Sequence, residues 1–179
     1  FTNAEIGDES INSLTMSALF HDASLIRGDS KLHRYQKHVL DSFVATQRNR
    51  YVLTAPTSFG KTFLVYEMIQ KMQYQNVLLI FPAISLLSEN YARLCSWEAF
   101  SDYAIHSLSE EEFDITQKNI FIFTPERFLS FMDSHQHLHF NFAFIDEVYK
   151  IDNSFVIDQE TSGENERDTA YRLALAESV

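Results

Sequence analysis

The chain has 179 residues, of which 45% are hydrophobic and 22% charged, and its formal net charge at pH 7 is -11. This length can bury the core of one compact lobe with flanks, and the absence of an apolar run near the roughly eighteen residues of a membrane span excludes a spanning helix. Cys95 is the only cysteine, which excludes a disulfide framework and, without a secretory signal, predicts a cytoplasmic protein. We expect Cys95 to be a small buried residue on a helix. The start at Phe1 instead of methionine indicates a fragment of a longer protein.

An amphipathic helix is predicted over residues 10–26, before a break at residues 28–30. Helices and strands then alternate. The predicted helices are 31–47, 60–73, 83–99 and 125–133, and the predicted strands are 51–55, 76–81, 103–107, 119–123 and 141–146. A polar, acidic loop over 158–166 precedes a last helix over 167–178. The alternation predicts an α/β fold, a parallel sheet with helices on both faces that binds ligands at the carboxyl ends of its strands.

The clearest motif follows the apolar run 51–54. It consists of Ala55, Pro56, Thr57, Ser58, Phe59, Gly60, Lys61 and Thr62. A strand that turns through such a loop into a helix binds phosphate through backbone N–H groups, while Lys61 neutralises charge and Thr62 offers a hydroxyl to Mg²⁺. Ala55 stands where the first glycine is usual. The alternative interpretation is an ordinary left-handed turn that caps a helix.

A second motif is the acidic pair Asp146 and Glu147, which follows the apolar run 141–145. The run predicts a strand covered on both faces. Asp146 at its end is suited to hold Mg²⁺, usually through water, and Glu147 to polarise the water that attacks a γ-phosphate. An isolated acidic pair is more often solvated, but the upstream phosphate loop favours the nucleotide-binding interpretation.

Further candidates lie around these two motifs. Gln36 offers an amide that both donates and accepts, as the adenine edge requires; the alternative is a polar residue on an amphipathic helix. Two helices are predicted to begin directly after strands, near prolines. Their starts could bind the phosphates of a nucleic-acid strand through backbone amides, or be simple connections. The residues concerned are Pro82, Ala83, Thr124, Pro125 and Arg127.

In this order the motifs resemble the first RecA-like lobe of a superfamily 2 helicase of the DEAD/DEAH-like group, over about residues 31–150. Gln36 matches the Q motif, and residues 55–62, 82–87, 124–127 and 146–149 match motifs I, Ia, Ib and II. Tyr149 departs from both named subgroups, and the Thr-Ser-Phe-Gly-Lys-Thr form is most similar to the Ski-like helicases. The resemblance implies a RecA-like P-loop NTPase lobe that binds ATP, Mg²⁺ and single-stranded DNA or RNA. It also implies a second RecA-like lobe, which supplies arginine fingers.

The predicted domains are an N-terminal helical flank over 1–30, the ATP-binding lobe over 31–150, and an acidic loop and helix over 151–179 that lead towards the missing remainder. A net charge of -11 argues at first against nucleic acid. However, the flanks carry -4 and -5, and the lobe only -2. A lobe that is close to neutral can still bind a nucleic-acid strand when its amide groups, and not a dense set of lysines, hold that strand. Within it, Glu110, Glu111 and Glu112 with Asp114 are expected to form a solvated loop.

Two interpretations therefore remain. The first is an ATP-dependent helicase or translocase, which includes a restriction-type translocase. The second is a nucleotide-gated P-loop switch in a signalling or defence assembly, which would have no need of helix starts that face a strand.

A group of alternating histidines, His135, His137 and His139, is conceivable as a metal site. Because these residues lie just before a strand in a segment expected to be exposed, a polar loop is the better interpretation.

Overall fold

The structure, a computed structural model, describes residues 26–27, 30–31, 34–44, 51–53 and 60–147. The chain divides into two compact units, residues 1–68 and residues 69–179. None of the helices within the described ranges is long and apolar enough to cross a membrane. Residues 10–25 of the helix predicted over 10–26 lie outside the described residues, as do the predicted helix at 167–178 and the predicted loop at 158–166.

The first unit begins with two short antiparallel strands, β1 (Ile26–Arg27) and β2 (Ser30–Lys31), so Ile26 and Lys31 belong to strands and not to the predicted helices. Helix α2 (Arg34–Ser42) is accordingly shorter than predicted, and it buries Gln36 and Leu40. Helix α3 runs over Lys61–Met72 and crosses the boundary between the units.

The predicted strand at 51–55 is wrong over its described part, because residues 51–53 form neither helix nor strand and are exposed. Tyr51 contacts the end of α2 instead of a neighbouring strand. Its hydroxyl donates to the Ser42 carbonyl at 3.1 Å, and its ring lies 4.5 Å from that of Phe43. The segment is therefore attached to the end of α2, whereas an apolar run becomes a strand only when its backbone finds a partner.

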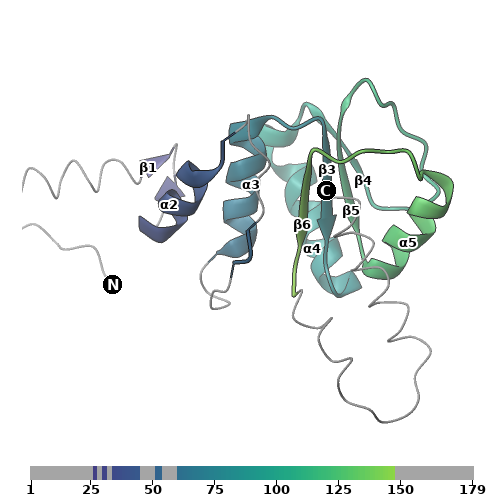
Figure 1. Ribbon diagram of the computed structural model, residues 1–179, viewed down its shortest axis with the longest axis horizontal. Helices are drawn as coiled ribbons and strands as arrows, with labels where there is room; N and C mark the ends of the chain where they lie inside the picture. The colour runs from purple at the N-terminus through teal and green to yellow at the C-terminus, as the bar shows by residue number, and fades with distance from the viewer. Residues whose placement is uncertain (1–25, 28–29, 32–33, 45–50, 54–59, 148–179) are drawn as a thin grey trace, which may run out of the picture. The chain divides into compact units, whose positions relative to one another are not determined.

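The second unit contains a parallel sheet with the strand order β4-β5-β3-β6 (Figure 1). The strands are β3 (Asn76–Ile80), β4 (Tyr103–His106), β5 (Lys118–Phe123) and β6 (Phe142–Ile145). The connecting elements are α4 (Ile84–Ser96), the short 3₁₀ helix η2 (Glu98–Phe100) and α5 (Pro125–Ser134). The predicted α/β fold with a parallel sheet is therefore confirmed, and these boundaries differ little from the predicted ones.

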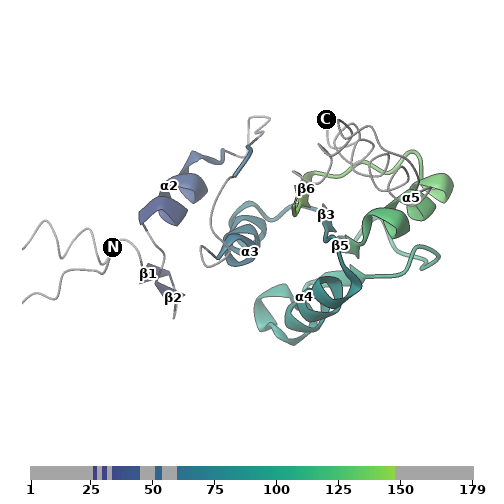
Figure 2. The same ribbon diagram turned by 90° about the horizontal axis from the view of Figure 1, so that it is seen from below.

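The core of this unit lies between the sheet and its helices, and α4 and α5 lie on opposite faces of the sheet (Figure 2). On the α5 face, alternate residues of β3 and β5 pack with apolar residues of the helix. This cluster consists of Leu78, Ile80, Phe121, Phe123, Phe128, Phe131, Met132 and Leu138. In contrast, every residue of β6 is partly exposed. Ala143 and Ile145 pack against this cluster, and the Phe144 ring on the other face lies 6.1 Å from that of Phe81, so β6 has neighbours on both faces. It is less buried than β3 and β5, because it is the last strand of the described sheet.

The prediction that Cys95 is buried on a helix is wrong in part, because Cys95 lies on helix α4 but is exposed. The buried residues of the helix are Leu87, Asn90 and Leu94. Their spacing defines one face of the helix. Cys95 follows Leu94 by one residue, about 100° further around the helix, and so lies off that face.

Asparagines connect the starts of three strands. Asn76 and Asn119 are partners in the β3–β5 register, with Asn119 Nδ2 3.3 Å from Asn76 Oδ1. The Asn119 amide also donates to the carbonyls of Asp114 and Gln117, at 3.0 and 2.9 Å. Asn141, directly before β6, accepts the Asn76 N–H at 2.9 Å. These bonds satisfy polar groups that would be costly to bury alone, since Asn119 has no exposed surface and Asn76 only 8%.

Candidate functional site

The carboxyl ends of three neighbouring strands meet at one edge of the sheet. The Phe81 N–H donates to the Phe123 carbonyl at 3.0 Å, and the Asp146 N–H donates to the Ile80 carbonyl, also at 3.0 Å. These bonds continue the β5–β3–β6 pairing by one residue. The predicted residues Pro82 and Ala83, Thr124 to Arg127, and Asp146 and Glu147 therefore follow adjacent strands at the same edge.

The two helix starts at this edge are built differently. In α5, Thr124 Oγ1 accepts the Arg127 N–H at 3.4 Å, and Pro125 occupies the first turn. Thr124 and Pro125 are buried. In α4, Ala83 is the N-cap and provides no side-chain bond, and both Pro82 and Ala83 are partly exposed. Ala83 therefore leaves the first N–H groups of α4 without a side-chain cap at the N-cap position, which suits the binding of an anion.

Arg127 extends from the first turn of α5 to the segment that follows β4. Its Nη1 donates to the Ser107 carbonyl at 3.0 Å, and the side chain is partly buried. The bond to a neutral acceptor fixes the guanidinium while its charge is retained. Sequence reasoning missed Ser107, since no motif marks a backbone carbonyl as a partner.

The acidic pair forms a tight turn at the end of β6. Asp146 Oδ1 accepts the Glu147 N–H at 3.0 Å. Glu147 has a φ of 55°, in the left-handed region that a residue with a side chain seldom adopts. Both residues are partly exposed. Such a conformation is typical of functional turns, because it persists only where its surroundings impose it.

On the nucleotide side, the structure describes only the end of the predicted loop. Gly60 has a φ of 75°, and its carbonyl accepts the Leu64 N–H at 3.1 Å, so it directly precedes the first turn of α3. Lys61 and Thr62 are the first residues of that helix, the position that phosphate binding requires. The other predicted loop residues, Ala55, Pro56, Thr57, Ser58 and Phe59, lie outside the described residues, as does Tyr149.

Gln36 lies against the end of this loop. A Cβ atom on Gly60 would be 3.0 Å from Gln36 Nε2, and Gln36 is only 4% exposed. A side chain at position 60 would therefore meet both a disfavoured φ and a close neighbour. The structure thus brings together two predicted site residues that are well separated in the sequence.

The histidine group has a structural explanation. The His135 ring stacks on Phe131 with centroids 4.3 Å apart, and its Nδ1 lies 3.0 Å from the Phe131 carbonyl. His139 accepts the Asn76 side-chain amide through its carbonyl, at 3.3 Å. Within the described ranges, no three histidine, cysteine or acidic residues are grouped so that they could hold a metal ion.

The family model for the type III restriction enzyme, res subunit, matches residues 29–173, most of the chain. No curated protein and no solved structure matches.

Proposed function

Because the chain belongs to the family of the type III restriction enzyme res subunit, we propose that it is the ATP-binding lobe of a translocase or helicase that acts on DNA or RNA. The family places it among the helicase-like P-loop nucleotide hydrolases of superfamily 2. The proposal goes beyond this class in assigning movement along a nucleic-acid strand.

The observation that carries the proposal is the common edge of β5, β3 and β6. The end of β3 leads into the uncapped start of α4, the end of β5 into the start of α5 with Arg127, and the end of β6 into Asp146 and Glu147. Amide groups and a cation that suit phosphate thus follow strands beside the acidic pair. This arrangement suits a protein in which nucleotide hydrolysis and strand binding influence each other.

We assign the nucleotide roles to residues as follows. Lys61 neutralises phosphate charge, and Gln36 selects adenine through its amide. Thr62 and Asp146 are the oxygen ligands for Mg²⁺, which when bound neutralises charge on the phosphates. Glu147 accepts the proton of the attacking water at its carboxylate. Gly60 fits this assignment, because its left-handed φ and the nearby Gln36 amide leave no room for a side chain where phosphate would approach.

The remaining proposals concern the context of the lobe. A second RecA-like lobe supplies the arginine fingers, the partner is a single strand, and the protein is cytoplasmic. The closer relation to Ski-like helicases also stays a proposal. A restriction-type translocase is the form that fits the family best.

The experiment measures steady-state ATP turnover of the full-length protein with and without single-stranded DNA, double-stranded DNA and RNA. We expect at least one of them to stimulate turnover, and the Glu147→Gln variant to show no stimulated turnover. Slow turnover that no nucleic acid changes would contradict the proposal and favour the nucleotide-gated switch.

A further inference from the structure

The loop between β4 and β5 contains a carboxylate that is connected to Arg127 through the backbone of a single residue, Ser107. Ser107 is the first residue of this loop, and its carbonyl accepts Arg127 Nη1 at 3.0 Å. The N–H of the same residue donates to Glu111 Oε2 at 3.3 Å. Arg127 and Glu111 therefore hold Ser107 from opposite ends of its backbone.

The other oxygen of Glu111 faces the sheet. Oε1 lies 3.5 Å from Nδ1 of His106, the buried last residue of β4. His106 is itself fixed, since its Nε2 lies 3.0 Å from Asn119 Oδ1 and its ring stacks on Phe121. The Asn119 amide group donates to backbone carbonyls, so its Oδ1 must be the atom that faces His106. Glu111 thus contacts a rigid part of the core.

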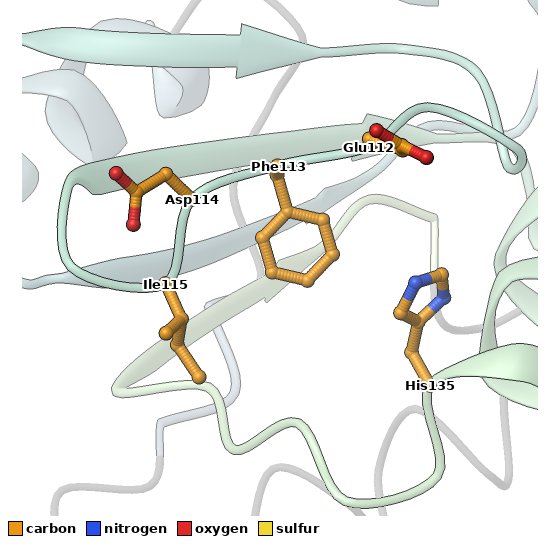
Figure 3. A pocket seen from close by; sticks show the side chains of 5 residues that line it. All are labelled: Glu112, Phe113, Asp114, Ile115 and His135. Carbon is orange, nitrogen blue, oxygen red and sulfur yellow. The ribbon is translucent and has the colours of Figure 1, made fainter.

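The rest of the loop is also attached to the core. Phe113 and His135 line an open pocket together with Glu112, Asp114 and Ile115 (Figure 3), and the volume of this pocket is about 500 Å³. The Phe113 ring lies 4.9 Å from that of Phe121 and 5.3 Å from that of His135. Hydrogen bonds from the side chain and backbone of Thr116 lower the pKa of Asp114, which stays a carboxylate. The loop is therefore more ordered than a solvated acidic run.

Glu111 differs from its neighbours in this respect. Glu110 and Glu112 are exposed, whereas Glu111 is partly buried and bonded to the Ser107 N–H. A carboxylate in direct contact with Arg127 would neutralise the guanidinium. Because the backbone of Ser107 lies between them, Glu111 fixes the guanidinium and leaves the cation able to contact a phosphate.

We propose that Glu111 is a positioning residue that holds Ser107 and, through its carbonyl, orients Arg127 towards the backbone of the bound nucleic-acid strand. The inference rests on the proposed strand contact of Arg127. It assigns a binding role to an acidic residue that would otherwise be expected to repel nucleic acid.

The test compares Glu111→Ala with Glu112→Ala in the full-length protein, because both variants remove one negative charge from adjacent positions. The measurement is the concentration of single strand that gives half-maximal stimulation of ATP turnover. We expect Glu111→Ala to raise it about three- to tenfold, the effect of one lost hydrogen bond, and to change it more than the maximal rate. Glu112→Ala should leave it unchanged or lower it. If the two variants behave alike, the proposal is wrong.

Two further variants separate positioning from general destabilisation. Glu111→Gln retains an oxygen acceptor for the Ser107 N–H, and we expect it to behave like Glu112→Ala. In an Arg127→Ala background, Glu111→Ala should have no further effect on half-saturation, since a residue that acts through Arg127 cannot act without it. Additive effects of the two substitutions would overturn the proposal.

A nucleic-acid-independent measurement distinguishes failure of this inference from failure of the proposed function. In ¹⁵N-arginine-labelled protein, hindered rotation of the Arg127 guanidinium should be visible by NMR in the parent and in Glu112→Ala, and lost in Glu111→Ala. The absence of stimulation by nucleic acid would contradict the proposed function and with it the role of Arg127 in strand binding. An Arg127 signal unchanged by Glu111→Ala would contradict the positioning role alone.

Discussion

At the start of the strands, Asn76, Asn119 and Asn141 bond to one another and to the backbone of other segments, whereas at the end of the strands the bonds of Thr124 and Asp146 are local. Thr124 accepts from Arg127, three residues on, and Asp146 accepts from Glu147. The asparagines instead bridge positions up to 65 residues apart in the sequence. The asparagine side chains at one edge thus connect strands, whereas the side chains of Thr124 and Asp146 at the other edge set turns. We therefore propose that the first edge supports stability and that the second supports binding and chemistry.

The strongest way to break this contrast is to change Glu147, the residue with a positive φ after β6. Glu147→Gln should lower maximal ATP turnover about 10²- to 10⁴-fold, the usual effect of losing a general base, with nucleotide affinity and unfolding temperature nearly unchanged. The exposed Glu98→Gln is the matched control. Steady-state kinetics and nucleotide titration measure both quantities. Turnover equal to the control would remove Glu147 from the reaction.

The opposite result is expected at Asn119, which is fully buried. Asn119→Ala removes one hydrogen-bond donor from each of the Asp114 and Gln117 carbonyls and removes the partner of His106 Nε2. We expect the free energy of unfolding to fall by about 2–4 kcal/mol, with nucleotide affinity of the folded protein unchanged. Denaturant unfolding measures the loss, and the exposed Gln136→Ala is the control. A loss of nucleotide affinity without a loss of stability would reverse the roles of the two edges.

Gly60 sharpens the contrast, because its conformation matters for both stability and binding. Gly60→Ala should weaken ATP binding about 5- to 30-fold, since alanine pays roughly 1–2 kcal/mol in the left-handed region. Gly60→Asn introduces the same contact with Gln36 but tolerates that φ better. ATP affinities of both variants separate the two causes. Equal affinities below that of the parent would assign the effect to the contact alone, and parental affinity in both would exclude Gly60 from the site.

Substitution of Gln36 tests whether this residue, which is buried beside Gly60, also selects the base of the nucleotide. We expect Gln36→Ala to reduce the preference for ATP over GTP about tenfold, because the amide can match the adenine edge but not that of guanine. Competition binding with the two nucleotides measures the ratio, and the exposed Gln136→Ala again serves as control. An intact preference in the variant would leave Gln36 with a packing role only.

The strands and helix starts of the second unit follow from short-range patterns. Apolar runs such as 120–123 lie between polar residues, and Pro125 follows Thr124 as an N-cap signal, so the predicted elements differ little from the observed ones. The same logic placed Asp146 after a strand. These features depend on neighbours in the sequence, which is why a single sequence is enough to find them.

The failures concern contacts between distant or backbone groups. The run at 51–53 has strand composition, but Tyr51 is hydrogen-bonded to Ser42 and the segment is not in a strand. Cys95 directly follows the buried Leu94, and this shift of one residue places it on an exposed side of helix α4. Glu111 lies in a run of three identical residues, and only the loop geometry makes it the one that bonds Ser107. The bond of Arg127 to a carbonyl twenty residues earlier has no sequence signal at all.

The smallest expected effect concerns Tyr103, at the start of β4 on the stability side of the contrast. Its hydroxyl donates to the Tyr74 carbonyl at 2.9 Å, and Asp102, which is paired with Lys118 at 2.6 Å, lies beside it. Burial, with a smaller contribution from the Asp102 charge, raises the pKa of Tyr103 from 10.0 to about 12. The folded state therefore holds this proton more tightly than the unfolded state. The resulting stabilisation is complete below about pH 10 and is lost as pH rises towards 12.

Tyr103→Phe removes the hydroxyl and should cost about 1 kcal/mol of unfolding free energy at pH 8. It should also make stability less dependent on pH above about 10, because the unfolded variant no longer releases this proton. Urea unfolding at a series of pH values measures both effects, and ultraviolet absorbance of the folded parent reports the ionisation directly. Burial also raises the pKa of Tyr74. Because Tyr74 is present in both proteins, its contribution to the pH dependence cancels when the two are compared. If parent and variant lose stability in parallel between pH 10 and 12, the proton on Tyr103 does not support the sheet, and the stability of this edge rests on its asparagines alone.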